Sequence, residues 1–544
     1  MVKKTLILSL LLVAAMVGPA VALDIPELYT TIQVNPGLRG NVLLAYLYDV
    51  RALDGVSQKT LINIVNTDPN YGIVARVRFR EYKRSTEVLD FHIPLTAGDV
   101  WSAEVYQCAS NGTAYIYAYD PAHPIHNFNA ADVSSGNWPL RLDLQNYDPV
   151  NPCPDTNGPD QGKGIAFQTL SMDVPNVART LYGYFEIIGE ERVSGEFSVL
   201  AAANPDGTWG VAPEIGTGVA CGPGFTGLPL DVCGRCPQNS LFSETWLVRV
   251  EDGTAQQYQD TAISNFTVNT AGIAASVSGV TPNLQNDAQG QGLNPGFGGL
   301  PQLESVLSKR NIFVQYWDDY SNFGARTSAV VTFPTKWAHF TPGSPCTTPT
   351  RPFVGPCETI QDTNPPDAFL VEIWDRDEHL LTPPSIPIIF SPHKPGKPLV
   401  TTWPFEVNIM GIYDVDRSAD LETSPPHSIS DASIGFPLGD IFRDNLLIST
   451  FLGATVFKTG WLNIDLAPDA SLLPAGVPGD QGDMVVDFNF FLNPASATNY
   501  LGYRGLPAIG GVLTEVSYQF YDLNYRTAVP WAYAVDWPWH PGLP

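Results

Sequence analysis

The chain has 544 residues, of which 44% are hydrophobic and 15% are charged, and it carries a formal net charge of −26 at pH 7. Its 47 glycines and 48 prolines exclude a coiled coil or a long helical bundle, whereas 60 aromatic residues (12 Trp, 22 Tyr and 26 Phe) exclude a disordered chain. The negative charge excludes nucleic acid as a partner, because the phosphates would be repelled, and the length predicts about two to four domains.

The first residues have the pattern of a secretory signal peptide. Lys3 and Lys4 precede a short apolar run, and Ala20-Val21-Ala22 supplies the small residues of a cleavage site. The run is too short for a membrane helix, and no later apolar stretch is long enough to span a bilayer. Cleavage after Ala22 removes two lysines and no acid, so the mature chain would carry −28. We therefore expect Sec-type export to the extracellular space or the outer cell surface.

The clearest strand pattern lies in residues 72–80. One face carries Ile73, Ala75, Val77 and Phe79, and the other carries Arg76, Arg78 and Arg80. A period of two is typical of a half-buried strand. We call the second set the arginine face and interpret it as a solvated sheet face, with contact to an acidic patch on another copy as the alternative.

Many other short segments are rich in β-forming residues and separated by turn formers. Expected strands, in chain order, are residues 61–65, 72–80, 87–95, 100–106, 113–119, 182–188, 245–250, 311–316, 328–333, 369–374, 405–412, 483–492 and 511–521. Only residues 301–310 look helical. The pattern predicts an all-β chain of tandem antiparallel β-sandwich (Ig-like) domains with long Pro/Gly-rich loops.

Composition divides the chain into four parts. These are the signal peptide (1–22), an N-terminal β-sandwich region (23–283), a Gly/Gln/Asn-rich linker (284–301) and a C-terminal β-sandwich region (302–544). The two regions share an echo: residues 61–79 resemble 312–333, 185–189 resemble 405–411, and 245–247 resemble 460–462. The order is preserved and the spacing is not, so duplication and the chance likeness of two sandwiches both remain open.

Seven cysteines lie in local clusters, which is typical of disulfides in an oxidising compartment. They are Cys108, Cys153, Cys221, Cys233, Cys236, Cys346 and Cys357. We expect Cys108–Cys153 and Cys346–Cys357 bridges, with two of the middle three cysteines bridged and one left over. A zinc or redox site at those three is the alternative, but no histidine lies nearby to complete four ligands.

Motifs for catalysis are few. The chain has no G-x-S-x-G, H-E-x-x-H, G-x-x-x-x-G-K-[ST] or C-x-x-C-H. His123 and His126 lie among prolines and are interpreted as a surface loop rather than a metal site. The acidic run from Asp375 to Glu378 is interpreted as a solvated turn rather than a carboxylate pair for sugar hydrolysis.

Two acidic loops are candidates for calcium. Asp414, Asp416 and Asp420 place oxygen side chains close together along one loop, as a hard cation requires. The loop lacks the EF-hand glycine and distal glutamate, so an ordinary polar turn is the alternative. A second cluster contains Asp155, Asn157 and Asp160. No other cofactor is expected.

The C-terminal segment is rich in aromatic residues. If extended, it places Trp531, Tyr533 and Trp537 on one face. Such a stripe could stack on sugar rings or dock on a neighbouring subunit, but sealing the edge of a sandwich core is the favoured interpretation.

Three segments carry a resemblance to a known group of proteins. Residues 87–101, 331–336 and 505–510 resemble recurring segments of large, uncharacterised, exported β-rich surface proteins of Gram-negative bacteria. The likeness runs from about residue 37 to residue 520. It implies export and a β-rich build, and nothing catalytic.

These observations favour a non-enzymatic, secreted structural protein of the cell surface or extracellular space that self-assembles into a layer or filament. A carbohydrate- or partner-binding adhesin is the second hypothesis, and a secreted hydrolase is the third. The expected partners are further copies of the chain or other surface components, and glycans under the second hypothesis.

Overall fold

The computed structural model of the chain describes residues 33–52, 57–69, 72–95, 97–118, 153, 164–169, 176–193, 239–249, 254–264, 266, 300–317, 325–339, 352–353, 368–376, 399–403, 405–413, 446–449, 451–452, 455–456, 459–466, 484–487, 500–503, 505–518 and 523–530. Most of these residues form β-strands in antiparallel sheets, as the sequence predicts. The helices in the described part are α5 (Leu300–Leu307) and the 3-10 helices η2 (Val177–Leu181) and η4 (Lys336–His339), and turns and loops connect the strands.

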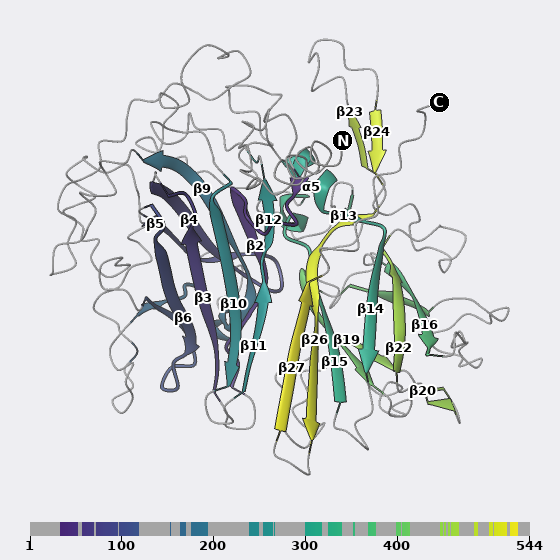
Figure 1. Cartoon of the computed structure of the whole chain (residues 1–544). Coiled ribbons are helices and arrows are strands. Elements are labelled where there is room, and N and C mark those ends of the chain that lie inside the picture. The colour runs from purple at the N-terminus through teal and green to yellow at the C-terminus, as the bar shows by residue number, and fades with distance from the viewer. Residues whose placement is uncertain are drawn as a thin grey trace, which may run out of the picture.

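The first half of the chain forms two six-stranded sheets (Figure 1). Sheet 1 has the order β1 (Gln33–Val34), β12 (Thr261–Ser264), β2 (Val42–Asp49), β9 (Tyr182–Val193), β4 (Gly72–Glu81), β5 (Glu87–Leu95). Sheet 2 has the order β11 (Thr254–Gln259), β10 (Leu241–Arg249), β3 (Gln58–Asn66), β6 (Val100–Gln107), β7 (Ala114–Ala118), β8 (Ile165–Ala166).

The second half forms two further main sheets and three short ladders. Sheet 3 has the order β14 (Asn311–Trp317), β22 (Thr459–Asp465), β16 (Ala368–Asp375), β17 (Leu399–Thr402). Sheet 4 has the order β19 (Leu446–Ser449), β18 (Val407–Tyr413), β15 (Ala325–Thr332), β26 (Ile509–Tyr518), β27 (Leu523–Pro530), with β18 and β19 parallel. The ladders join β13 (Ser308–Lys309) to β25 (Leu506–Pro507), β20 (Phe451–Leu452) to β21 (Thr455–Val456), and β23 (Met484–Asp487) to β24 (Tyr500–Tyr503).

Sheets 1 and 2 pack face to face over the larger hydrophobic core, and we call them the N-terminal unit. Val77 and Phe79 point into this core from β4, as their alternation with the arginines predicts. Ile62 enters it from β3, and Phe91 of β5 meets Trp101 of β6 with ring centroids 5.8 Å apart.

Sheets 3 and 4 enclose a second core, and we call them the C-terminal unit. Val314 and Leu462 enter this core from sheet 3, and Val331 and Met410 enter it from sheet 4. Trp403, which is fully buried, stacks on Phe369 with ring centroids 3.8 Å apart. Aromatic burial therefore supplies much of the apolar area in this smaller core.

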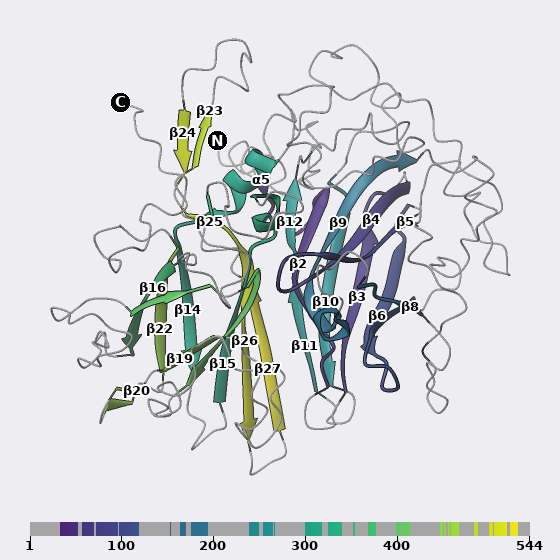
Figure 2. The same cartoon turned by 180° about the vertical axis from the view of Figure 1, so that it is seen from behind.

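The two units are fused because sheet 4 is buried on both faces. Alternate residues of its strands, including Val330, Val407 and Ile409, belong to the core of the N-terminal unit. They pack beside β2, and Thr332 Oγ1 donates a hydrogen bond of 2.7 Å to the carbonyl oxygen of Tyr46. Strands β11 and β27, at the edges of sheets 2 and 4, also lie side by side in both views (Figures 1 and 2). Each edge is thus covered by the other unit.

Helix α5 ends earlier than the sequence pattern predicts. It spans Leu300–Leu307 rather than 301–310, because Ser308 and Lys309 leave the helix to pair with Pro507 and Leu506. Leu303 and Leu307 pack into the larger core. The linker expected at 284–301 lies outside the described residues up to 299, and its last two residues are helical. The four-part division of the chain stays a prediction.

The proposed internal echo coincides with two matching strand pairs. Strand β3 pairs antiparallel with β10, and β14 pairs antiparallel with β22. Likewise β4 pairs with β9, and β15 pairs with β18. The neighbours differ, however: β3 lies between β10 and β6, whereas its counterpart β14 is at the edge of sheet 3 and pairs within that sheet only with β22. Duplication of the two units therefore stays a prediction.

Candidate functional site

The arginine face is buried, so its interpretation as a solvated sheet face is wrong. Arg76, Arg78 and Arg80 are 2%, 4% and 3% exposed, respectively. Their side chains point away from the hydrophobic core, as the alternation predicts, but other parts of the same chain cover them. The three guanidinium groups are consequently not exposed for contact with another copy.

Carboxylates of the same sheet neutralise these arginines. Arg76 Nε donates to Asp90 Oδ1 at 2.6 Å, and its Nη2 also contacts Asp90. Arg78 Nε lies 2.9 Å from Glu87 Oε2, and Arg80 Nε donates to Glu186 Oε1 at 2.5 Å. Buried charges persist only when they are paired in this way, because transfer from water is costly for each ion.

The C-terminal unit covers the end of this face where β4 leaves the sheet. The guanidinium carbon of Arg80 lies 3.8 Å from the ring centroid of Trp337 in η4. The carbonyl oxygen of Tyr82 accepts hydrogen bonds from the backbone nitrogens of Glu406 (3.0 Å) and Val407 (2.9 Å). Tyr184 donates its hydroxyl proton to the carbonyl oxygen of Pro334 at 3.1 Å. The charged face is therefore part of the contact between the two units.

Glu81 organises the turn that makes this contact. Its carboxylate accepts the backbone N–H groups of Lys83 (2.7 Å), Arg84 (2.9 Å) and Thr86 (3.2 Å). It also accepts a hydrogen bond of 2.6 Å from Arg179 Nη2, which η2 presents. Because the carboxylate caps the turn and is itself paired, the chain between β4 and β5 is held in one conformation.

Burial shifts the pKa of two groups near this contact. It lowers the pKa of Arg78 to about 10, and the neighbouring charges of Arg76 and Arg80 act in the same direction. It also raises the pKa of Glu406 well above its usual value, against the opposing effect of Lys336. Both carboxyl oxygens of Glu406 are buried and make no hydrogen bond with the described residues. Burial without a hydrogen-bond partner among the described residues thus favours the protonated form of the Glu406 carboxyl.

A second buried carboxyl lies in the N-terminal unit. Asp260 accepts a hydrogen bond from Thr245 Oγ1 at 3.0 Å and another from Ser243 Oγ. Burial raises the pKa of Asp260 to about 7, although both hydrogen bonds oppose the shift. This group titrates near physiological pH, in an interior that also contains the hydroxyl groups of Tyr46 and Tyr258.

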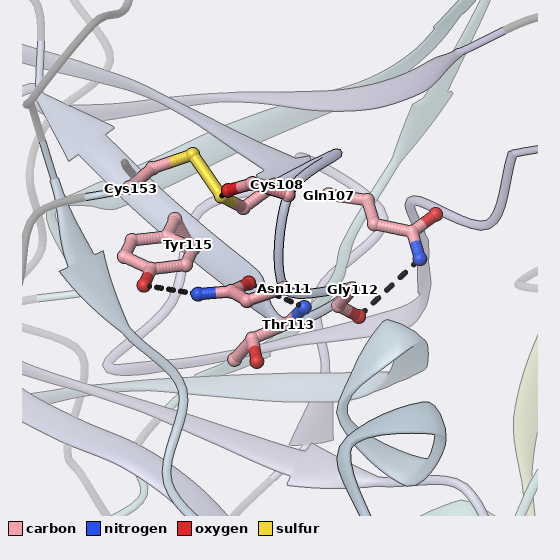
Figure 3. The surroundings of a disulfide bond; sticks show 8 residues. Gln107, Cys108, Asn111, Gly112, Thr113, Tyr115 and Cys153 are labelled. Carbon is pink, nitrogen blue, oxygen red and sulfur yellow. Dashed lines mark hydrogen bonds between the residues drawn. A yellow bond between two sulfur atoms is a disulfide. The ribbon is translucent and has the colours of Figure 1, made fainter. Parts of the chain in front are cut away.

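The structure joins Cys108 to Cys153, one of the two specific bridges expected from the sequence (Figure 3). Cys108 begins the turn between β6 and β7, where Asn111 Nδ2 donates to Tyr115 Oη at 2.9 Å. Both sulfurs are buried beside the Tyr115 ring. The bridge ties Cys153, 45 residues along the chain, to the far edge of sheet 2.

The other site residues expected from the sequence lie outside the described residues. These are Asp414, Asp416 and Asp420; Asp155, Asn157 and Asp160; His123 and His126; Cys221, Cys233, Cys236, Cys346 and Cys357; and Trp531, Tyr533 and Trp537. Asp375 is the last residue of β16. Among the residues that the structure does describe, no group of three or more His, Cys, Asp or Glu side chains is placed to hold a metal ion.

The sequence reasoning missed an aromatic surface on sheet 3. Phe313, Trp461 and Trp374 lie on three neighbouring strands with their rings in contact. Phe313 is 53% exposed. Alternation within β14 and β22 placed these residues opposite core residues, which was a usable signal, but only the strand order brings them together.

Within the described part of the chain, no helix is long and apolar enough to cross a membrane. No protein-family model, curated protein or solved structure matches this chain. Its function must therefore be inferred from its own residues.

Proposed function

We propose that this chain is an exported structural protein of the cell surface or extracellular space, built from two Ig-like β-sandwich units and able to self-associate into a layer or filament. The observation that carries the proposal is the contact between the units. Sheet 4 is buried on both faces, and charged, aromatic and backbone groups all link it to sheet 1. Because the N-terminal and C-terminal units are held together in this way, they would transmit load without a flexible joint between them.

Export is part of the proposal and is supported by the signal-peptide pattern and the Cys108–Cys153 bridge. The resemblance to exported β-rich surface proteins of Gram-negative bacteria points the same way. Intact mass of secreted material, before and after reduction, should give a chain that begins at Leu23 and has three bridges. Seven free thiols in secreted protein would contradict both the bridges and the oxidising compartment.

Calcium is the cation proposed to support self-association. A mature chain of charge −28 repels its own copies, and at ordinary salt the screening length is about 8–10 Å, so only close contacts survive. Cations bound at Asp414, Asp416 and Asp420 would offset that repulsion where copies meet.

Size-exclusion chromatography with light scattering on the mature chain tests the proposal. We expect large particles with calcium and smaller ones after addition of a chelator, and Asp414→Ala with Asp416→Ala should reproduce the chelator's effect. If particle size changes neither with the chelator nor with the double substitution, calcium has no role in self-association. A monomer at every protein concentration, with and without calcium, would contradict self-assembly itself.

A further inference from the structure

The outer face of sheet 3 carries an aromatic strip that crosses three strands. The ring centroids of Phe313 and Trp461 are 5.9 Å apart, and those of Trp461 and Trp374 are 5.4 Å apart with the two indoles inclined by only 3°. These separations follow the strand spacing of about 4.8 Å, since each ring comes from the next strand of the sheet. Phe313 is 53% exposed, and both indoles are partly exposed. The Phe313 ring is tilted by 52° to the Trp461 indole, so the strip is a stepped aromatic surface whose most exposed part is Phe313.

A row of polar groups lies beside the strip on the same face. Asn311 Nδ2 donates a hydrogen bond of 2.8 Å to Asn463 Oδ1, and Asn463 Nδ2 donates one of 3.0 Å to Glu372 Oε2. In register, Asn463 is opposite Phe313 and Glu372, whereas Trp461 is opposite Gln315 and Trp374. The polar row thus neighbours the aromatic strip, and its mutual hydrogen bonds fix the orientation of each amide and carboxylate.

The strip is not needed to close the core. The opposite face of the same strands supplies Val314, Leu462 and Ile373 to the second core, where they are buried. Of the described residues, the large exposed hydrophobic ones are Val100, Val177 and Phe313, and the last is the aromatic one among them. An exposed aromatic ring that contacts a second ring, which stacks in turn on a third, is typical of a binding surface when polar groups lie beside it.

We propose that this face binds a neutral, linear polysaccharide. The flat C–H faces of pyranose rings carry partial positive charge and stack on the negative faces of aromatic rings, which bury them from water. Beside the rings, amide groups can donate to and accept from sugar hydroxyls, and the carboxylate can accept from them. The strip and the polar row supply both kinds of contact side by side, so the surface matches this ligand class.

Charge selects neutral glycans. The strand residues of this face include Glu372 and Asp465 but no lysine or arginine in the part of the sheet that the structure describes. The whole chain carries −26. Acidic polysaccharides would therefore be repelled both locally and by the long-range field. The proposal goes beyond self-assembly and does not depend on it.

Retention of the full mature chain on insoluble neutral polysaccharides tests the proposal, with microcrystalline cellulose, chitin, mannan and a β-1,3-glucan as the probes and alginate as the acidic comparison. We expect retention on at least one neutral probe and none on alginate. Phe313→Ala should weaken binding about tenfold, which corresponds to about 1.4 kcal/mol. Trp461→Ala should weaken it further, and Trp461→Phe should restore part of the loss because it keeps a ring.

Two measurements keep this test decisive. Val100→Ala, at an exposed position in the N-terminal unit, should bind as the wild type does. If Trp461→Ala fails to fold, Phe313→Ala alone decides the outcome, since that side chain is more than half exposed. Failure to bind every neutral probe, equal binding to alginate, or unchanged binding by Phe313→Ala would overturn the proposal. A change in particle mass in Phe313→Ala, without glycan binding by the wild type, would make this face a contact between copies and would overturn it too.

Discussion

The outer faces of sheets 1 and 3 show the same strand alternation but differ in their exposure to solvent. On sheet 1 the residues facing away from the core are arginines, yet Arg76 is only 2% exposed. On sheet 3 the residues facing away from the core include aromatics, yet Phe313 is 53% exposed. Alternation thus identifies the two sides of a strand but not which side meets water, because the rest of the chain decides what covers each sheet.

The two faces also differ in what holds them together. On the arginine face each desolvated charge depends on a partner, so loss of one carboxylate leaves guanidinium groups without compensation. On the aromatic face Phe313 is more than half exposed, so loss of this ring removes little buried area. The arginine face should therefore be sensitive to substitution in stability, and the aromatic face in binding.

Removal of Glu186 should have the largest effect on stability. Glu186 is fully buried, accepts a hydrogen bond from Arg80, and lies 3.9 Å from Arg78 Nη1. Glu186→Ala should lower the free energy of unfolding by about 3–5 kcal/mol, measured by urea denaturation. Arg376→Ala, at an exposed position after β16, should change it by less than about 0.5 kcal/mol. Equal effects of the two substitutions would show that the buried network does not stabilise the contact.

Loss of the Cys108–Cys153 bridge should have the next largest effect. The bridge closes a loop with a sequence separation of 45 residues. Cys108→Ser with Cys153→Ser should therefore lower the free energy of unfolding by about 2–4 kcal/mol, mainly because the unfolded chain gains entropy. Val177→Ala serves as the control, because Val177 is exposed, and it should leave the urea midpoint nearly unchanged. An unchanged midpoint in the double variant would mean that the loop is restrained by other contacts.

The pH dependence of stability should carry a contribution from Asp260. The pKa of the Asp260 carboxyl is about 7 in the folded chain, whereas the ordinary value for aspartate is 3.8. The folded state therefore binds more protons between these values, and stability should fall as pH rises from about 4 to about 7. Asp260→Asn should reduce this pH-dependent loss of the free energy of unfolding by at least about 1 kcal/mol, since one pKa unit corresponds to about 1.36 kcal/mol.

Urea denaturation of both proteins at a series of pH values measures the Asp260 effect. The aspartate and asparagine side chains have similar shapes, and one of the Ser243 and Thr245 hydroxyls can still donate to the amide oxygen while the other can accept from the amide nitrogen. Parallel stability curves for the two proteins across this pH range would show that Asp260 is not the group responsible.

Phe313→Ala should have the smallest effect on stability and sharpens the comparison between the faces. Because the ring is 53% exposed, we expect a loss below about 1 kcal/mol in urea denaturation. A loss as large as that of Glu186→Ala would instead make the aromatic strip a structural element of sheet 3. Glycan binding and stability are thus separable readouts at this position.

Strands whose residues alternate in polarity were readily found in the sequence even where both faces are buried, whereas a continuous apolar strand was missed. Residues 87–95 were predicted as a strand with the same bounds that β5 has in the structure. Strand β2, by contrast, was missed. Its sequence VLLAYLYD shows no alternation, because one side packs into the N-terminal core and the other meets the C-terminal unit. A continuous apolar run does not distinguish a doubly covered strand from other buried segments.

Of the candidate sites, the disulfide was found from the sequence and the aromatic strip was not. Clustering along the chain was enough to pair Cys108 with Cys153, because a local bridge depends on few other choices of the fold. The three rings of the aromatic strip, however, come from residues 313, 374 and 461. No local pattern connects them, since strand β22 lies between β14 and β16 although it follows both in the chain.

The sequence by itself determined that this protein is β-rich, that residues 72–80 have an apolar and an arginine side, and that Cys108 and Cys153 are neighbours. These properties depend on alternation and on short-range spacing, which a chain carries locally. Only the tertiary structure decided that the arginines are buried, that sheet 4 serves two cores, and that three distant aromatic residues meet on one open face. The physical reason is that exposure belongs to the packed assembly of sheets: a side chain is charged or apolar before folding, but it becomes buried or open only when another part of the chain covers it or leaves it in water.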